Sequence, residues 1–387
     1  MDCDVAIVGA GHSGLLLAAA LAGTGARLRL IDPSPADPSA ASDGRNLALV
    51  RGSRQLMEEL GVWPAVAAVA EPVHRVIVVD RVAGTRLEWR AEDHGGEPFA
   101  FGVEHGHLRA ALARALVASR AEVGQLPARL IGLERAPRRI ELALADGSRL
   151  AARLVVGCDG RGSRVRELAG IGLDRWTYGQ AALTFIVRTA RDAAGTIREW
   201  LRPAGPLALL SLPGERTGVT WVEPEPMATA LARLPEAELL RRLAEETDGF
   251  GYQGRLESAV SVWPLSAQHA RRYVAPRLVL VGDAAHGVHP IHAQGFNMAV
   301  ADVAVLARLL RRALRRGGDP GAPELLLAYE RARRPGNRQR IWMTDGFARI
   351  FAVDRPVLRP LRIAAMELVA RVPWIARFAV GHGTRLL

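Results

Sequence analysis

The amino-acid sequence predicts an α/β fold: a discontinuous Rossmann-like domain, an inserted mostly antiparallel β-sheet and a helical C-terminus. Segment Asp4–Gly14 has the pattern of a buried strand, a glycine turn and a helix start. Segment Leu278–His286 is a second apolar strand, and it ends in Gly-Asp. Between them, residues 172–270 contain short apolar runs separated by Pro/Gly turns, which is typical of an antiparallel sheet.

Length and composition indicate a globular protein with more than one structural unit. A chain of 387 residues exceeds the size of one simple core. The net charge is +11 and all basic residues are arginines, but no basic run carries interleaved aromatic residues, so we expect no nucleic-acid partner. Cys3 and Cys158 have no nearby cysteine, which favours a reduced, cytoplasmic location. We expect neither a signal peptide nor a transmembrane helix.

The glycines after the first strand fit a dinucleotide pyrophosphate. Gly9 is expected to make the tight turn, Gly11 to let the backbone approach the phosphates, and Gly14 to allow close packing of helix on strand. Ser13 lies in the same turn, and the free amides of the helix start attract anions. Asp32 ends the second strand, where a carboxylate can accept hydrogen bonds from ribose hydroxyls.

The later Gly282-Asp283 pair distinguishes between dinucleotides. A carboxylate at the end of another buried strand can meet a ribityl chain, which FAD carries and NAD lacks. The two motifs together therefore predict FAD and redox chemistry at its flavin ring.

A third motif, Gly157–Arg166, also follows a strand. With the other two motifs in this order, the chain resembles the aromatic-hydroxylase class of flavoprotein monooxygenases. The resemblance implies that Asp159, Gly160, Ser163 and Arg166 support FAD and the transient binding of NAD(P)H. The alternative is that Asp159 only braces the turn.

Four further segments are similar in sequence to the ubiquinone-biosynthesis hydroxylases. These are Asp43–Leu49 with Leu60–Trp63, Val103–Leu112, Pro203–Leu210, and His289–Asn297 with Asp302-Val303. The resemblance covers nearly the whole chain.

Several site residues are implied by this resemblance. Pro290 and Gly295 would form the environment of the flavin ring, with no side-chain acid or base expected. Helix-start amides around Gly295, Phe296 and Asn297 would face flavin O2, where a reduced flavin carries negative charge. The implied FAD contacts further include Gly282, Asp283, Arg45, His105 and Arg109.

The chain departs from the family pattern at three places. Asp32 stands where Glu is usual, His105 where Asn, Arg or Gln is usual, and His292-Ala293 where the pair usually ends in Gly. The last change bears on the substrate position. His286, His289 and His292 have a spacing that suggests a metal, but no carboxylate or cysteine completes a ligand set, so we expect none.

The resemblance also implies a reaction. NAD(P)H, a transient co-substrate, reduces FAD, and dioxygen then gives a flavin C4a-hydroperoxide that hydroxylates an electron-rich ring. The implied substrate is a hydrophobic polyprenylated phenol or quinol of ubiquinone biosynthesis. Basic and apolar residues alternate over residues 358–378, and this C-terminal region could contact the inner membrane peripherally or a biosynthetic complex, although packing on the FAD domain is the alternative.

The expected organisation is discontinuous. Segments 1–72, 101–171 and 273–335 would form the FAD-binding domain, segments 73–100 and 172–272 the substrate sheet, and segment 336–387 the C-terminal helices. Residues 46–60 are expected to form one helix.

Other functions remain open at this point. One is a monooxygenase of a soluble aromatic compound, another is a flavin-dependent reductase of prenyl groups, and a third is a non-catalytic flavoprotein scaffold. A flavin halogenase is disfavoured because the chain has no lysine and no Trp-x-Trp stretch.

Overall fold

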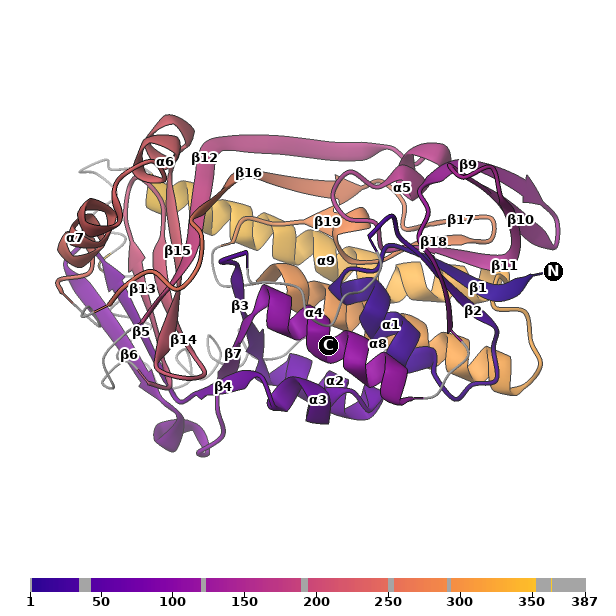
Figure 1. Cartoon of the computed structure of the whole chain (residues 1–387), viewed down its shortest axis with the longest axis horizontal. Coiled ribbons are helices and arrows are strands. Elements are labelled where there is room, and N and C mark those ends of the chain that lie inside the picture. Colours follow the sequence, from indigo (N-terminus) through magenta and orange to yellow (C-terminus); the bar gives the residue numbers. More distant parts are fainter. Residues whose placement is uncertain are drawn as a thin grey trace.

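The structure is a computed structural model that describes residues 2–34, 43–119, 123–188, 194–249, 254–290, 294–352 and 363. Within these residues two large sheets lie towards opposite ends of the long axis, with helices between and below them (Figure 1). Two long strands, β12 (Leu173–Arg188) and β16 (Ser261–Ala270), run from one end towards the other.

The first sheet has the strand order β17-β18-β11-β1-β2-β8, with β10 paired to β11 and β9 to β10. Its strands are β1 (Cys3–Val8), β2 (Leu28–Ile31), β8 (Val123–Leu126), β9 (Leu130–Ala136), β10 (Arg139–Leu144), β11 (Arg149–Gly157), β17 (Val274–Ala275) and β18 (Leu278–Leu280). Strands β18, β11, β1, β2 and β8 are parallel neighbours. Their apolar residues are buried, as expected for a sheet covered on both faces.

The register of this sheet aligns the carboxyl ends of its central strands. Val8 of β1 pairs with Ile31 of β2 and with Gly157 of β11, and Gly157 pairs with Leu280 of β18. The segments that follow these strands therefore leave the sheet along one edge. In open α/β sheets this edge is where ligands bind.

Helices α1, α4 and α8 cover this sheet. Helix α1 (His12–Leu21) is buried along nearly its whole length and packs between α4 (His105–Ala118) and α8 (Gln294–Arg315). The long helix α9 (Pro323–Ala352) packs on α8 and runs back along the molecule (Figure 1). The shorter helices here are α2 (Arg51–Leu60), α3 (Trp63–Ala67) and α5 (Arg164–Leu168).

The second sheet has the order β19-β16-β12-β15-β14-β13-β5-β6 and is antiparallel except for the β5–β13 pair. Its other strands are β5 (Arg75–Asp80), β6 (Thr85–Arg90), β13 (Thr196–Leu201), β14 (Leu207–Leu212), β15 (Arg216–Pro224) and β19 (His286–Gly287). Helices α6 (Glu225–Leu231) and α7 (Glu236–Glu246) pack on it around a core of its own, which includes Phe185, Trp200 and Trp221.

The predicted fold class is confirmed, but one element differs. Residues 46–50 form strand β3 (Asn46–Val50), not the start of a helix, and α2 begins only at Arg51. β3 pairs with β7 (Ala100–Glu104), which also pairs with β4 (Ala70–Val73), so a partner about 55 residues away decides its conformation. The domain boundaries given above stay a prediction.

The closest approach in the glycine turn gives a test of the fold. A Cβ added at Gly14 would lie 1.8 Å from the carbonyl oxygen of Gly9, whereas a Cβ at Gly11 would meet no described residue within 4 Å. We predict that Gly14→Ala lowers the free energy of unfolding by about 3 kcal/mol or more. The matched variant Gly11→Ala should cost about 1 kcal/mol or less, because it changes only a helix-cap residue. Urea unfolding compares the two, and equal losses would contradict this packing.

Candidate active site

Four loops meet at the carboxyl edge of the first sheet. The glycine turn follows β1, Asp32 follows β2, the Cys158–Ser163 turn follows β11, and the η3 turn (Gly282–Ala284) follows β18. The edge therefore brings together the two motifs on which the sequence prediction of FAD depended and the third motif, Gly157–Arg166.

The glycine turn packs tightly on one side and is open on the other. Gly9 has a φ of +107°, and a Cβ there would lie 2.4 Å from the carbonyl oxygen of Cys158. Gly11 caps the start of α1 and has open space before it. The first amides of α1 lack intrahelical partners, so this open side is suited to an anion.

Asp32 and Arg109 hold the turn in place. The backbone amide of Ala10 donates to Oδ2 of Asp32 at 2.7 Å, and the amide of Ser34 donates to Oδ1 at 2.8 Å. Arg109 of α4 donates to the carbonyl oxygens of Ala10 and Ser34 at 3.2 and 3.1 Å. Each Asp32 oxygen keeps a lone pair for a further donor.

Asp159 is engaged within its own turn. It accepts from Oγ of Ser163 at 2.5 Å and from the amide of Val165 at 3.0 Å, and burial raises its pKa. Arg166 is buried and donates to the carbonyl oxygens of Ala284 and Arg161 at 2.9 and 3.0 Å. These contacts connect the β11 turn to the η3 turn. They favour the bracing alternative for Asp159.

The η3 turn presents a carboxylate. Gly282 has a φ of +59°, and a Cβ there would meet Oγ of Ser13 at 2.8 Å, so this turn lies against the start of α1. The Asp283 carbonyl oxygen accepts from Gln268 at 2.8 Å. The half-buried Asp283 carboxylate has no hydrogen-bonding partner within the described part of the chain, so it is available to a ligand.

A buried charged cluster supports the η3 turn from behind. The carboxylate of Asp302, on α8, accepts from the Gly282 amide at 3.2 Å and from Nε2 of His286 at 2.5 Å. It also accepts from Nε of Arg333 at 2.8 Å and Nδ2 of Asn337 at 2.9 Å, both on α9. Burial opposes its charge, but His286 and Arg333 outweigh this and hold its pKa well below the usual range.

Two histidines line the start of α1. The buried His12 donates from Nε2 to the His105 carbonyl oxygen at 2.8 Å, and the two rings meet edge to face with centroids 4.1 Å apart. The ring of Phe296 lies 5.2 Å from that of His12. Burial lowers the pKa of His12 to about 4, and burial with the neighbouring His12 lowers that of His105 to about 2. Both rings are therefore neutral at pH 7.

Arg45 is held by its neighbours. Its guanidinium forms an ion pair with Asp43 and lies 4.3 Å over the ring of Trp263 on β16. Burial raises the pKa of Asp43, but the hydrogen bonds and charge of Arg45 outweigh it, so the pKa is lowered overall.

The first turn of α8 completes the site. The buried Asn297 side chain accepts from the Val50 amide and the Ser53 hydroxyl at 3.1 and 2.6 Å and donates to the Ala48 carbonyl at 2.8 Å, so its contacts belong to the protein. A Cβ at Gly295 would lie 3.9 Å from Val288 and would meet no other described residue within 4 Å. Pro290 is half-buried, and His292-Ala293 lie outside the described residues. Among the described residues, no group of three His, Cys, Asp or Glu could hold a metal ion.

Comparisons with known proteins agree with this geometry. A family model described as FAD binding domain matches residues 2–342. The chain is 40% identical to the ubiquinone hydroxylase UbiL of Rhodospirillum rubrum over 98% of this chain and 89% of that protein. It is 31% identical to the 3-demethoxyubiquinol 3-hydroxylase of Escherichia coli over 99% and 98% of the two chains.

A solved structure supports the fold. The p-nitrophenol 4-monooxygenase PnpA of Pseudomonas putida superposes with a TM-score of 0.79 at 18% identity, covering 98% of this chain and 96% of that one. The fold and the motifs at the sheet edge define an FAD-binding protein of the aromatic-monooxygenase class. The chain belongs to the FAD binding domain family and, within it, to the ubiquinone-biosynthesis hydroxylases.

Some residues of the site were missed from the sequence. His12 lies inside the glycine motif, where only the glycines carry a recognisable pattern. Arg333 and Asn337 lie on one face of α9 at a spacing of four, and Asp302 was noted only as part of a family segment. A buried charged pair leaves no periodic signal, because its partners are far apart in sequence.

The Asp302 cluster should dominate stability. We predict that Asp302→Asn lowers the free energy of unfolding by about 3–5 kcal/mol, because Arg333 is left buried without its carboxylate. The control is Asp345→Asn on α9, a carboxylate that is only partly buried and accepts from Trp176 and Tyr178. It should cost about 1 kcal/mol. Urea denaturation that finds equal losses would contradict a special role for Asp302.

The buried His12 should also make stability pH-dependent. Its pKa is about 4 when folded, against 6.5 as the usual value, so the unfolded chain takes up the proton first as pH falls. The contribution of the neutral His12 to the free energy of unfolding is therefore fully present above pH 6.5 and is lost as the pH falls from 6.5 to 4. When the pH is lowered from 7 to 5, the free energy of unfolding should fall by about 2 kcal/mol less in His12→Gln than in the wild type. The exposed His74→Gln is the control, and a slope unchanged in His12→Gln would contradict this assignment.

Proposed function

We propose that the protein hydroxylates the aromatic ring of a polyprenylated phenol or quinol in ubiquinone biosynthesis, using FAD, NAD(P)H and dioxygen. The observation that carries this proposal is the 40% identity to a ubiquinone hydroxylase along 98% of the chain, with the glycine turn and the Gly282-Asp283 pair both present at the sheet edge. The second named relative, a 3-demethoxyubiquinol 3-hydroxylase, supports the same substrate class.

The residues at the sheet edge fit FAD. A Cβ added at Gly11 would meet no described residue within 4 Å. The space beside this residue can therefore receive a pyrophosphate. The Asp283 carboxylate, which no described side chain or amide satisfies, belongs to the residue after Gly282, whose backbone lies against Ser13 at the start of α1. An available carboxylate beside an open helix start matches a ligand that carries both hydroxyls and phosphates.

Each residue then has a separate task. Asp32 would accept from ribose hydroxyls, with Arg109 fixing the loop that carries it. The first amides of α1 would bind the pyrophosphate, and Asp283 the ribityl hydroxyls. The amides of Gly295, Phe296 and Asn297 would face the pyrimidine side of the flavin, beside Pro290.

The chemistry needs no acid or base from the chain. When bound, FAD accepts electrons from NAD(P)H and passes them to dioxygen, which supplies the oxygen atom. The protein orients the substrate ring and excludes water from it. The rings of His12 and His105, at the start of α1, are neutral at pH 7, so they add no charge beside the amides that would bind the pyrophosphate.

Arg45 and Asp159 have different proposed roles, one by direct contact with FAD and one through the protein. Arg45 would contact FAD, since Asp43 and Trp263 hold its guanidinium in one orientation. Asp159, Ser163 and Arg166 would act mainly through the η3 turn that they support. His105 would contribute its ring contact with His12.

A peripheral contact with the inner membrane or a biosynthetic complex also stays part of this proposal. The C-terminal stretch that suggested it lies, apart from residue 363, outside the described residues. No helix in the described ranges is long and apolar enough to cross a membrane. A polyprenylated substrate would reach the enzyme from a lipid phase.

Oxygen uptake tests the reaction. With NADH or NADPH and a short-chain prenylphenol, we expect faster flavin reduction and one dioxygen consumed per hydroxylated product. Catalase in a parallel assay measures peroxide as the control. If the flavin is reduced but only peroxide forms, the substrate class is rejected. If neither NADH nor NADPH reduces the flavin of the FAD-bound protein, the scaffold alternative is favoured.

The proposed role of Asp283 can be tested by binding alone. Asp283→Ala should weaken FAD binding by on the order of 10–100-fold, the effect of losing hydrogen bonds to a charged acceptor. Without FAD, the Asp283→Ala variant should have the same thermal stability as the wild type, since the carboxylate has no partner among the described residues. Quenching of flavin fluorescence gives the affinity. The exposed Asp93→Ala is the control, and equal FAD affinity in the two variants would contradict the role.

A further inference from the structure

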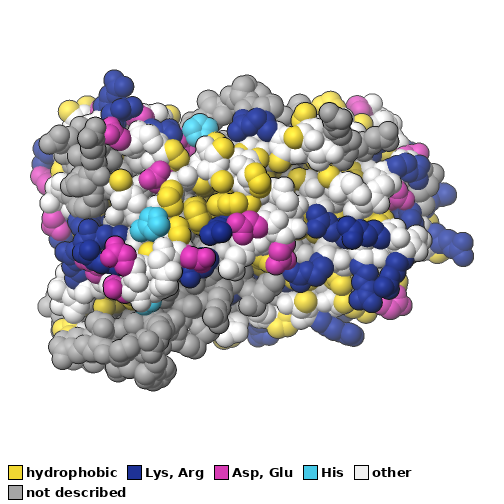
Figure 2. All heavy atoms as spheres, turned by 90° about the horizontal axis from the view of Figure 1, so that it is seen from below, with side chains coloured by type: hydrophobic (Ala, Val, Ile, Leu, Met, Phe, Trp, Pro, Cys, Tyr) yellow, Lys and Arg dark blue, Asp and Glu magenta, His cyan; other side chains and the backbone are white. Residues whose placement is uncertain are grey.

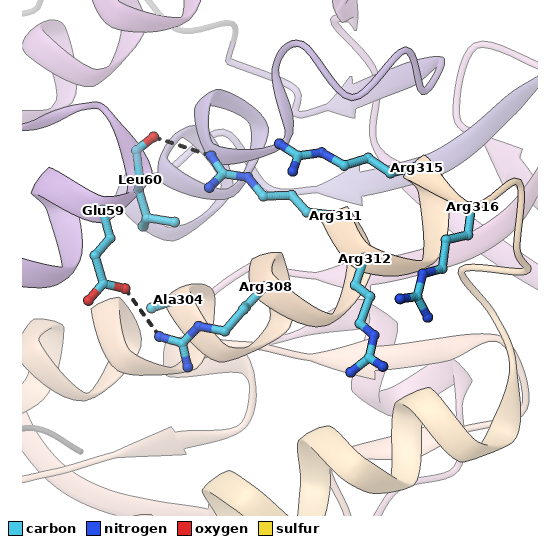
Figure 3. A pocket seen from close by; sticks show the side chains of 8 residues that line it. All are labelled: Glu59, Leu60, Ala304, Arg308, Arg311, Arg312, Arg315 and Arg316. Carbon is cyan, nitrogen blue, oxygen red and sulfur yellow. Dashed lines mark hydrogen bonds and ion pairs between the residues drawn. The ribbon is translucent and has the colours of Figure 1, made fainter.

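A hollow lined by arginines lies at the far end of α8 from the candidate active site. Its volume is about 390 Å³, and Glu59, Leu60, Ala304, Arg308, Arg311, Arg312, Arg315 and Arg316 line it (Figure 3). We call this the arginine pocket. It holds five guanidinium groups and one carboxylate, so its positive charge is not balanced from within.

Two of the five arginines are tied to the protein. Arg308 forms an ion pair with Glu59 at 3.2 Å. Arg311 donates from Nε to the carbonyl oxygen of Ala20 at 2.6 Å and from Nη2 to that of Leu60 at 3.3 Å. Burial and the nearby charge of Arg315 lower the pKa of Arg311, which means that these cations repel each other.

The side chains of the other three arginines are exposed and make no hydrogen bond or ion pair with any described residue. These are Arg312, Arg315 and Arg316 (Figure 3). Arginines near a helix C-terminus often serve its last carbonyl groups. Here backbone amides already do so, because Arg316 and Gly318 donate to the Ala313 carbonyl and Gly317 donates to that of Leu314. Capping of the helix therefore does not account for the cluster.

The pocket is separate from the candidate active site. At 1.5 Å per residue, Arg308 and Arg315 lie about 20 and 30 Å along α8 from Gly295. A ligand held here by its phosphate does not place its remaining part beside Gly295 unless it is very long. The pocket is thus suited to docking rather than to delivery of a reducing co-substrate.

We propose that the arginine pocket binds phosphate groups, and that anionic lipid head groups on a membrane surface are their source. Planar guanidinium groups bind phosphate oxygens in pairs, and several such groups around one hollow can hold one head group while the exposed ones contact others. Seen from below, many basic side chains lie over the half of the molecule towards which α8 finishes, and a further group lies at the opposite end (Figures 1 and 2). The choice of a lipid rests on the proposed function, since a polyprenylated substrate resides in a bilayer.

Vesicle sedimentation tests this proposal without any assay of activity. The full chain is mixed with vesicles of phosphatidylcholine alone or with 30% phosphatidylglycerol added. The test variant is the triple change Arg312→Gln, Arg315→Gln, Arg316→Gln. The control is Arg138→Gln, Arg149→Gln, Arg233→Gln, which removes the same charge from exposed positions outside α8. Thermal unfolding shows that both variants are folded.

We expect binding to the anionic vesicles only, reduced on the order of 100-fold in the test variant and far less in the control. Equal losses in both variants would overturn the proposal, because the net charge would then explain binding. The wild type could fail to bind either kind of vesicle and still bind inorganic phosphate, with this phosphate binding lost in the test variant. That result would assign the site to a free phosphate compound and reject the lipid. Since no turnover is measured, failure here is distinct from failure of the proposed hydroxylation.

Discussion

The buried carboxylate of Asp302 is the contact on which the candidate site depends. Four donors from three separate segments meet at its two oxygens: the Gly282 amide, His286, and Arg333 with Asn337. This single group fixes α8 to α9 and holds the η3 turn from behind. Because Asp283 follows Gly282 in that turn, the same contact fixes the backbone that carries the available carboxylate.

A second constraint acts from the register of the first sheet. Val8, Ile31, Gly157 and Leu280 are neighbours across four parallel strands, so the loops after them cannot diverge. Gly9 and Gly14 allow these loops to pack without side chains between them. The result is an edge at which protein contacts fix the loops, while helix-start amides and the carboxylates of Asp32 and Asp283 are left to meet a ligand. That division explains why Asp159 and Asn297 serve the fold while Asp283 is left for a ligand.

What could be predicted from the sequence follows from the range of the interactions. The glycine turn, Asp32 and the Gly282-Asp283 pair could be predicted because a strand followed directly by a turn is a local pattern. The expected helix at residues 46–50 was wrong because β7, far along the chain, pairs with it. The Asn297 side chain could not be placed, since its partners lie about 245 residues away. The Asp302 cluster and the arginine pocket also join distant segments, and a charged residue in a helix is normally a solvated one.

The central claim is that the protein transfers one oxygen atom from dioxygen to an aromatic ring. The most direct measurement is the mass of the product formed from a prenylphenol under ¹⁸O₂ in ordinary water, with NAD(P)H and FAD supplied. One labelled oxygen is expected in each hydroxylated product. A product that carries oxygen from water, or NAD(P)H oxidation without any labelled product, would contradict it.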